Sequence, residues 1–204
     1  MGEPFTQDNL EIPWDYFVAE ENSNGDVKGW TLTSILGDML ALAEDMFGRR
    51  DHTYTILGIE FVSSGPQCWY STTGNQIIVQ LDLDCLNDQY DACVQLAHEC
   101  IHLLSPTRLK DANVLEEGVA VYFQGFYMRK TFGSGWWDND MVDANYQSAL
   151  TSVDELLRIE PDAIKMLREH EPTISRISSD LIISLIPAVN PVLAHELSRS
   201  FCTD

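Results

Sequence analysis

The feature that most constrains this chain is an H-E-x-x-H motif, His98 to His102, inside an apolar run that favours a helix. Residues four apart project from the same face of an α-helix, so His98 and His102 lie side by side. Two neutral imidazoles placed in this way can bind one Zn²⁺ ion, and Glu99 can reach a water on the metal and remove its proton. A catalytic zinc needs a third protein ligand and one open position. The motif therefore predicts a further ligand elsewhere in the chain.

We expect this third ligand to be Glu117, the first residue of the E-G-V-A segment 117–120. Fourteen residues lie between His102 and Glu117. This length allows a break at Ser105 and Pro106, because proline ends a helix, and a second helix that returns alongside the first.

The two motifs together resemble those of the gluzincin metallopeptidases, in which H-E-x-x-H and a glutamate on the next helix hold the zinc. The second motif of that family often reads N-E-G-x-A, and here Glu116 stands in place of the asparagine. The resemblance covers residues 76–125. The metzincin pattern is absent, because Ser105 and Arg108 occupy the positions of its glycine and its third histidine.

This resemblance implies a zinc-dependent peptide-bond hydrolase whose metal is held by His98, His102 and Glu117, with water in the fourth position. Zinc lowers the pKa of that water from about 15.7 towards about 7, so Glu99 can act as general base and then protonate the leaving amine. A peptide or protein is the expected substrate. The G-x-M-E-N segment of the aminopeptidase branch is absent, so aminopeptidase activity is not expected.

Two supporting roles stay open at the level of sequence. Gluzincins often place a Tyr or His near the oxyanion, and the candidates here are Tyr122, Tyr127, His170 and His195. Glu116 and Asp111 are candidates for orienting an imidazole. Thermolysin-like members can use an aspartate four residues beyond the glutamate ligand for this purpose, but that position is Val121 here.

Two other classes of function compete with the peptidase hypothesis. One is a zincin-shaped binding or regulatory protein with little turnover, whose helical C-terminal third engages a partner. The other is a structural helical protein that binds no metal, since H-E-x-x-H also occurs by chance on solvated helices. The apolar residues around the motif in 94–104 argue against chance, because polar groups on a buried face need a partner.

Composition predicts one domain over residues 1–204, with a sizeable core. Hydrophobic residues make up 45% of the chain and charged residues 22%. We divide it into an irregular lead-in at 1–30, a catalytic core at 31–130 and a helical C-terminal part at 141–204. A net charge of −20 argues against nucleic acid and against anionic membranes as partners.

The cysteines and the N-terminal sequence favour a soluble, cytoplasmic protein. The five cysteines form no C-x-x-C pair and are expected to be free thiols in a reducing compartment. Cys100 lies inside the motif but is expected to point away from the histidines into the core. No basic start, apolar signal region or bilayer-length apolar stretch is present.

The order of the helix and strand signals predicts an α+β, zincin-like fold with a small, mostly antiparallel sheet. The expected N-terminal helix is capped by Thr31 or Thr33 and ends near Arg49, and 54–62 is an expected strand. A hairpin is expected from 67–71 and 76–82. By the gluzincin resemblance, 76–82 is the candidate edge strand for pairing with an extended substrate, and an ordinary sheet strand is the alternative.

The remaining segments are predicted to be helical, apart from one loop. The active-site helix begins at Asn87 or Asp88, and Asn113 caps a glutamate helix that reaches Lys130. We expect Trp136 and Trp137 to pin the loop 131–140 to the core. The expected C-terminal helices are 141–159, 161–170, 174–186 and 191–201, separated by prolines.

Overall fold

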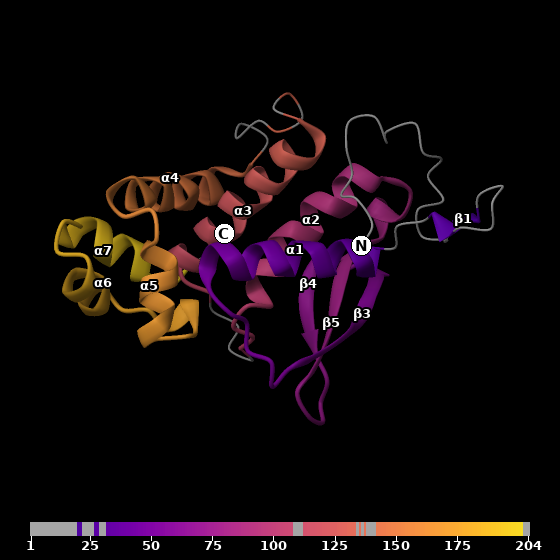
Figure 1. The fold of residues 1–204 in the computed structure, drawn as a ribbon, viewed down its shortest axis with the longest axis horizontal. Coiled ribbons are helices and arrows are strands. Elements are labelled where there is room, and N and C mark those ends of the chain that lie inside the picture. The colour runs from indigo at the N-terminus through magenta and orange to yellow at the C-terminus, as the bar shows by residue number, and fades with distance from the viewer. Residues whose placement is uncertain are drawn as a thin grey trace.

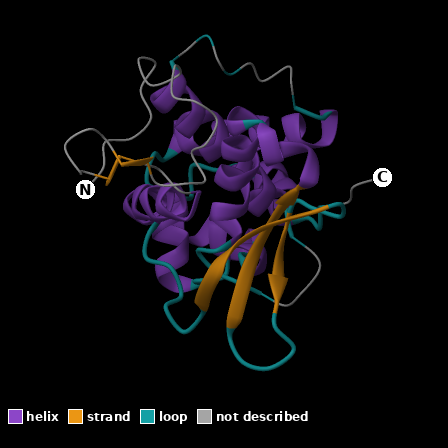
Figure 2. Cartoon of the chain, turned by 90° about the vertical axis from the view of Figure 1, so that its right-hand side faces the viewer, coloured by secondary structure: helices purple, strands orange, loops and turns teal. Residues whose placement is uncertain are grey.

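The computed structural model of the chain describes residues 20–21, 27–28, 32–107, 112–133, 135, 137 and 142–201. Most of the predicted lead-in lies outside these residues, as do Arg108, Asp111, Trp136 and Cys202. The described residues form seven α-helices and a small three-stranded sheet, which confirms the α+β prediction. The sheet lies at one side of the helices (Figure 2).

The three-stranded sheet is mixed, so the prediction of a mostly antiparallel sheet was wrong. Its strands β3 (Thr55–Val62), β4 (Gln67–Tyr70) and β5 (Gln76–Asp82) are arranged in the order β3-β5-β4. The predicted hairpin of β4 and β5 is present, but β5 also pairs with β3 in parallel. The two-residue strands β1 (Glu20–Glu21) and β2 (Val27–Lys28) form a separate antiparallel pair.

The apolar side chains of β5 explain its central place. Ile77, Val79 and Leu81 are fully buried on the face that packs against the helices. On the opposite face, the Gln80 amide accepts a hydrogen bond from Gln67 and donates one to Glu60, on the two neighbouring strands. The edge strands are β3 and β4, and β4 is the one that contacts α2. The prediction that 76–82 is the open edge was therefore wrong, and its alternative, an ordinary sheet strand, is what the structure has.

Helix α1 (Leu32–Phe47) crosses the molecule in front of the other central elements (Figure 1). Its apolar residues recur at helical spacing, as the sequence predicts, and most are buried, while Leu42 and Met46 are half-buried. The helix packs against α2 (Gln89–His102), and the ring of Phe47 meets that of Phe123 edge-on. Gly48 follows the last residue of the helix, with a φ of 91° that favours glycine.

Helices α2 and α3 (Val114–Phe132) pack side by side and carry the two motifs. The Asp88 side chain caps α2 by accepting from the Asp91 backbone N–H, after a 3₁₀ turn at Leu83–Asn87. The Asn113 side chain caps α3 by accepting from the Glu116 N–H. Both caps agree with the predicted helix starts.

The C-terminal third is helical, with α4 (Ala144–Ile159), α5 (Ala163–His170), α6 (Ser179–Leu185) and α7 (Pro191–Ser198). The single helix predicted over 174–186 is instead a 3₁₀ turn, Ile174–Arg176, followed by α6. The break occurs because Ile177 and Ser178 are extended and the Ser178 hydroxyl caps α6. Trp137, one of the two tryptophans expected to hold the loop 131–140 against the core, is buried.

The cysteines Cys68, Cys85, Cys93 and Cys100 are free thiols. Cys100 is fully buried in the core, as predicted, and burial raises the pKa of its thiol. None of the helices that the structure describes is both long enough and apolar enough to cross a membrane.

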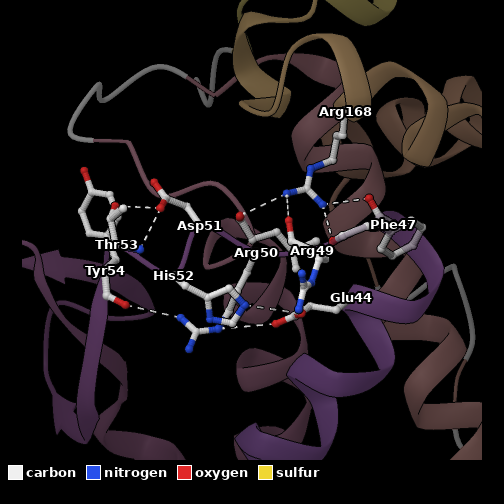
Figure 3. A network of polar contacts seen from close by, with 11 residues as sticks. Glu44, Phe47, Arg49, Arg50, Asp51, His52, Thr53, Tyr54 and Arg168 are labelled. Atoms are coloured by element: carbon white, nitrogen blue, oxygen red, sulfur yellow. Dashed lines mark hydrogen bonds and ion pairs between the residues drawn. The ribbon is translucent and has the colours of Figure 1, made fainter.

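Arg168 joins the C-terminal helices to the core. Its side chain points from α5 to the end of α1 (Figure 3). All five N–H groups of its guanidinium are used. They donate to the backbone carbonyls of Phe47, Gly48, Arg49, Leu104 and Pro172, at 2.6–3.2 Å. The residue therefore fixes the end of α1 and the turn that follows α2.

We predict that Arg168→Leu lowers the free energy of unfolding by about 2–4 kcal/mol, because it leaves several buried carbonyls without a donor. Arg168→Lys should recover part of the loss, since an ammonium has only three donors in a different geometry. Urea unfolding followed by circular dichroism measures both effects. Arg158→Leu, at an exposed position of α4, is the control. Equal stability of the Arg168 and Arg158 variants would contradict this role.

Candidate metal centre

The packing of α2 against α3 brings together the three residues that the sequence predicts as metal ligands. His98 and His102 lie on α2, and Glu117 lies in the first turn of α3. One ligand atom from each of the three lies within 4.8 Å of the others. His98 Nε2 is 3.2 Å from Glu117 Oε2, and His102 Nε2 is 3.8 Å from Glu117 Oε1. These residues form a group that could hold a metal ion.

The spacing of these atoms fits a tetrahedral ion. Bonds of about 2.0–2.1 Å at tetrahedral angles place ligand atoms about 3.3 Å apart, close to the two distances above. Glu117 Oε2 is also buried without a hydrogen-bond partner, despite its proximity to His98. A buried carboxylate oxygen without a hydrogen bond destabilises the folded protein. A cation shared with the imidazoles would satisfy it.

Glu116 orients the second imidazole. Its Oε1 lies 3.1 Å from His102 Nδ1, so a proton on Nδ1 leaves the lone pair of Nε2 facing Glu117. Asn113 caps α3 through the Glu116 N–H and so fixes the start of the helix that carries both glutamates. Of the two candidates for this role in the sequence, Glu116 is in place, and Asp111 lies outside the described residues.

The charges of the site favour a bound cation. Burial by itself would lower the pKa of His102, but the carboxylates of Glu117 and Glu116 outweigh it and raise this pKa to about 10. Burial likewise opposes ionisation of Glu117, yet His102 and His98 hold its pKa below the ordinary value. A proton on His102 therefore occupies the electrostatic role that a metal ion would take, and the two compete.

Glu99 lies beside the three-residue group without being a member of it, as the sequence predicts. Its side chain is only 4% exposed and lines a cleft of about 660 Å³. His98, His102, Glu116 and Glu117 line the same cleft, and residues 66–70, which include β4, also border it. The thiol of Cys68 donates to the Glu99 backbone carbonyl at 3.8 Å.

Tyr146, in the first turn of α4, also lines the cleft and was missed by sequence reasoning. Its ring meets the ring of His98 edge-on at 5.7 Å and packs against Phe201. Burial, with the charges of Glu117 and Glu99, raises the pKa of Tyr146 to about 12. The phenol therefore keeps its proton at neutral pH and can donate it into the cleft.

Gly118 allows α4 to lie close enough to α3 for this contact. A Cβ at this position would lie 2.5 Å from the Ala149 carbonyl oxygen and 2.6 Å from Val153 Cγ2. The glycine that follows Glu117 in the motif therefore has a packing role. No local sequence pattern marked Tyr146, because its position depends on this helix contact.

The four residues predicted as candidates for oxyanion stabilisation lie elsewhere. Tyr122 packs edge-on against Phe47, and Tyr127 is buried beside Phe123. His170 and His195 are exposed on α5 and α7. None of the four lines the cleft.

No protein-family model matches the chain, and no curated protein or solved structure is significantly similar to it. The geometry of the site and the chemistry of its residues therefore carry the functional argument.

We predict that the protein binds close to one equivalent of metal and that His98→Ala, His102→Ala and Glu117→Ala abolish this binding. Each variant removes one of three ligands. Elemental analysis after dialysis measures the metal content. His170→Ala is the matched control, because that histidine is exposed on α5. Equal metal in all five proteins, the wild type included, would refute the assignment.

Glu116→Ala should retain the metal but bind it about 10–100-fold more weakly, because Glu116 orients a ligand without being one. Competition with a chelator of known affinity measures the change. A complete loss of metal in Glu116→Ala together with full retention in Glu117→Ala would show that the two roles are reversed.

Proposed function

We propose that this chain is a zinc-dependent peptidase of the gluzincin type, with a zincin-like fold, that hydrolyses peptide bonds with Glu99 as general base. The observation that supports this most is the convergence of four residues, His98, Glu99, His102 and Glu117, on one cleft bordered by an edge strand. Two imidazoles and one carboxylate are a donor set that catalytic zinc sites use, with one position left for water or substrate.

Bound zinc would supply a Lewis acid that polarises the scissile carbonyl and lowers the pKa of water. The residues of the chain account for the remaining steps. Glu99 accepts the proton of the attacking water and donates it to the leaving amine. Its burial beside the cleft keeps the carboxylate close to the reacting atoms and limits its contact with bulk water.

Tyr146 is the proposed donor to the oxygen on which negative charge develops. Its hydroxyl belongs to a side chain that contacts His98 and lines the cleft. A phenol carries its proton at neutral pH and can donate a hydrogen bond. A fixed donor at this point stabilises the transition state more than the substrate.

The edge strand β4 favours an extended peptide as substrate. In an antiparallel pair, residues whose backbone groups bond to the partner strand alternate with residues whose groups point away from it. Ser71 N–H bonds to Gln76 C=O, so the backbone N–H and C=O of Cys68, three residues earlier, point away from β5. Residues of β4 line the cleft. A substrate strand can pair along this edge through backbone hydrogen bonds, which require little sequence specificity.

The competing hypothesis of a partner-binding C-terminal third gains no support from the described surface. An exposed apolar stripe on 174–186 would favour it. The apolar side chains there are buried or half-buried, and the large exposed apolar residues lie elsewhere. They are Leu57, Trp69, Leu83, Leu86 and Val192.

We predict that Glu99→Gln keeps its zinc and its fold but loses about 10²–10⁴-fold of peptidase activity, because the amide cannot act as a base. The assay incubates zinc-loaded proteins with a broad pool of unstructured peptides and identifies products by mass spectrometry. Glu155→Gln, at an exposed position of α4, is the control. A zinc-loaded wild type that cleaves no peptide, or a Glu99→Gln variant as fast as wild type, would contradict the proposal.

We predict that Tyr146→Phe lowers kcat by about 10²–10³-fold and leaves zinc affinity unchanged, because it removes one oxyanion donor. Steady-state kinetics on one peptide from the pool measures this loss. Tyr122→Phe is the matched control, since Tyr122 does not line the cleft and its ring packs against Phe47. An unchanged kcat in Tyr146→Phe would remove this residue from the mechanism.

A further inference from the structure

A second cavity, of about 540 Å³, opens from the catalytic cleft. The two share Pro66, His98, Glu99 and Tyr146, so the second cavity begins at the proposed general base. Its volume is typical of ligand pockets. A side chain of a bound peptide, next to the bond that reaches Glu99, can enter it.

The walls of this cavity are largely apolar and aromatic. They are formed by Tyr90 and Val94 of α2, Val121 of α3, and Trp137 and Val142 before α4. Val121 is the position at which thermolysin-like sequences can have an aspartate. Its apolar side chain here lines the cavity. Such walls suit a long aliphatic stem, and aromatic rings can also stack against a guanidinium.

Apart from His98, the ionisable side chains with a charge at neutral pH that line the cavity are acidic. Asp91 and Asp143 line it at exposed positions, and neither forms an ion pair with a described residue. One carboxylate oxygen of Asp143 also accepts from the Asn145 N–H. Gln124 donates one N–H of its amide to the Val94 carbonyl, which leaves its carbonyl oxygen as an acceptor and its second N–H as a donor. No Lys or Arg is among the described residues that line the cavity. Gln95, which also lines it, accepts from the Asp82 N–H and has only its amide NH₂ left to donate.

Together these features distinguish a cationic side chain from a neutral one. A neutral apolar residue would fill the walls but gain no attraction to the two carboxylates, which lie at exposed positions. An acidic residue would add to the repulsion from Asp91, Asp143 and Glu99. An arginine or lysine buries its stem against the walls and brings its charge to the carboxylates.

We propose that this cavity is the specificity pocket of the enzyme and selects peptides with an arginine or lysine beside the scissile bond. The proposal rests on the peptidase function above, because it names the substrate class of the same site. The net charge of −20 supports it, since a negative protein concentrates cationic peptides near its surface.

The test compares four unstructured peptides that differ at one position, which holds arginine, citrulline, norleucine or glutamate within an alanine–glycine sequence. Citrulline has the shape of arginine without its charge. We expect kcat/KM for arginine to exceed that for citrulline by about twofold to thirtyfold, as two exposed charge pairs would give. The ratio should fall as salt is raised.

Two double variants test whether the aspartates of the cavity cause the preference for arginine over citrulline. Asp91→Asn with Asp143→Asn should bring the arginine-to-citrulline ratio close to one, while Asn at 143 can still cap α4. Asp162→Asn with Asp180→Asn changes the net charge equally at two exposed positions outside the cavity, and should preserve the ratio. Equal loss in both double variants would show an effect of net charge alone and would overturn the pocket.

Peptide binding separates this proposal from the peptidase function. Fluorescence anisotropy of the same peptides, labelled with fluorescein, on zinc-loaded Glu99→Gln should show the same order of affinity. Cleavage by wild type with no preference for arginine over citrulline, or with a preference for norleucine, overturns the pocket and leaves the peptidase function standing. Discrimination in binding with no cleavage by wild type supports the pocket and overturns the peptidase function. If wild type cleaves no peptide and binding shows no discrimination, both the pocket and the peptidase function are overturned.

Discussion

The contact between the last turn of α2 and the first turn of α3 is the constraint on which the site depends. Consecutive helical residues project about 100° apart, and this separation lets Glu116 and Glu117 meet different atoms. Glu116 contacts Nδ1 of His102, while Glu117 faces Nε2 of both histidines. Asn113 fixes the start of α3, and Gly118 admits α4 with Tyr146. A small shift of either helix would separate these groups.

Charge is distributed unevenly around this contact. Three carboxylates, of Glu99, Glu116 and Glu117, line the cleft, and no Lys or Arg is among the described residues that line it. The guanidinium of Arg168 does not line the cleft and instead donates to backbone carbonyls, which include that of Leu104, two residues after His102. The fold thus uses a buried cation to fix its backbone, and leaves the cleft with a negative charge that a metal ion can balance.

The sequence predicted what depends on local spacing. The pairing of His98 with His102, the place of Glu99 and both helix caps follow from helical periodicity and capping chemistry, while Glu117 came from its motif and its distance along the chain. The structure brings the three candidate ligands together. Tyr146 and the central place of β5 were missed, because each depends on contacts between segments distant in the chain. The sheet was expected to be mostly antiparallel, yet the apolar β5 lies between the other two strands and pairs with β3 in parallel. Patterns over a few neighbouring residues do not show which distant segments of the chain come into contact.

The zinc K-edge X-ray absorption spectrum of protein loaded with one equivalent of zinc identifies the atoms that surround the metal. Zinc bound to His98, His102 and Glu117 should have nitrogen and oxygen neighbours at about 2.0–2.1 Å, with the multiple scattering of two imidazoles and no sulfur. A sulfur neighbour at about 2.3 Å would place zinc on a cysteine, and the absence of imidazole scattering would place it away from α2. Either result would contradict a site built from His98, His102 and Glu117.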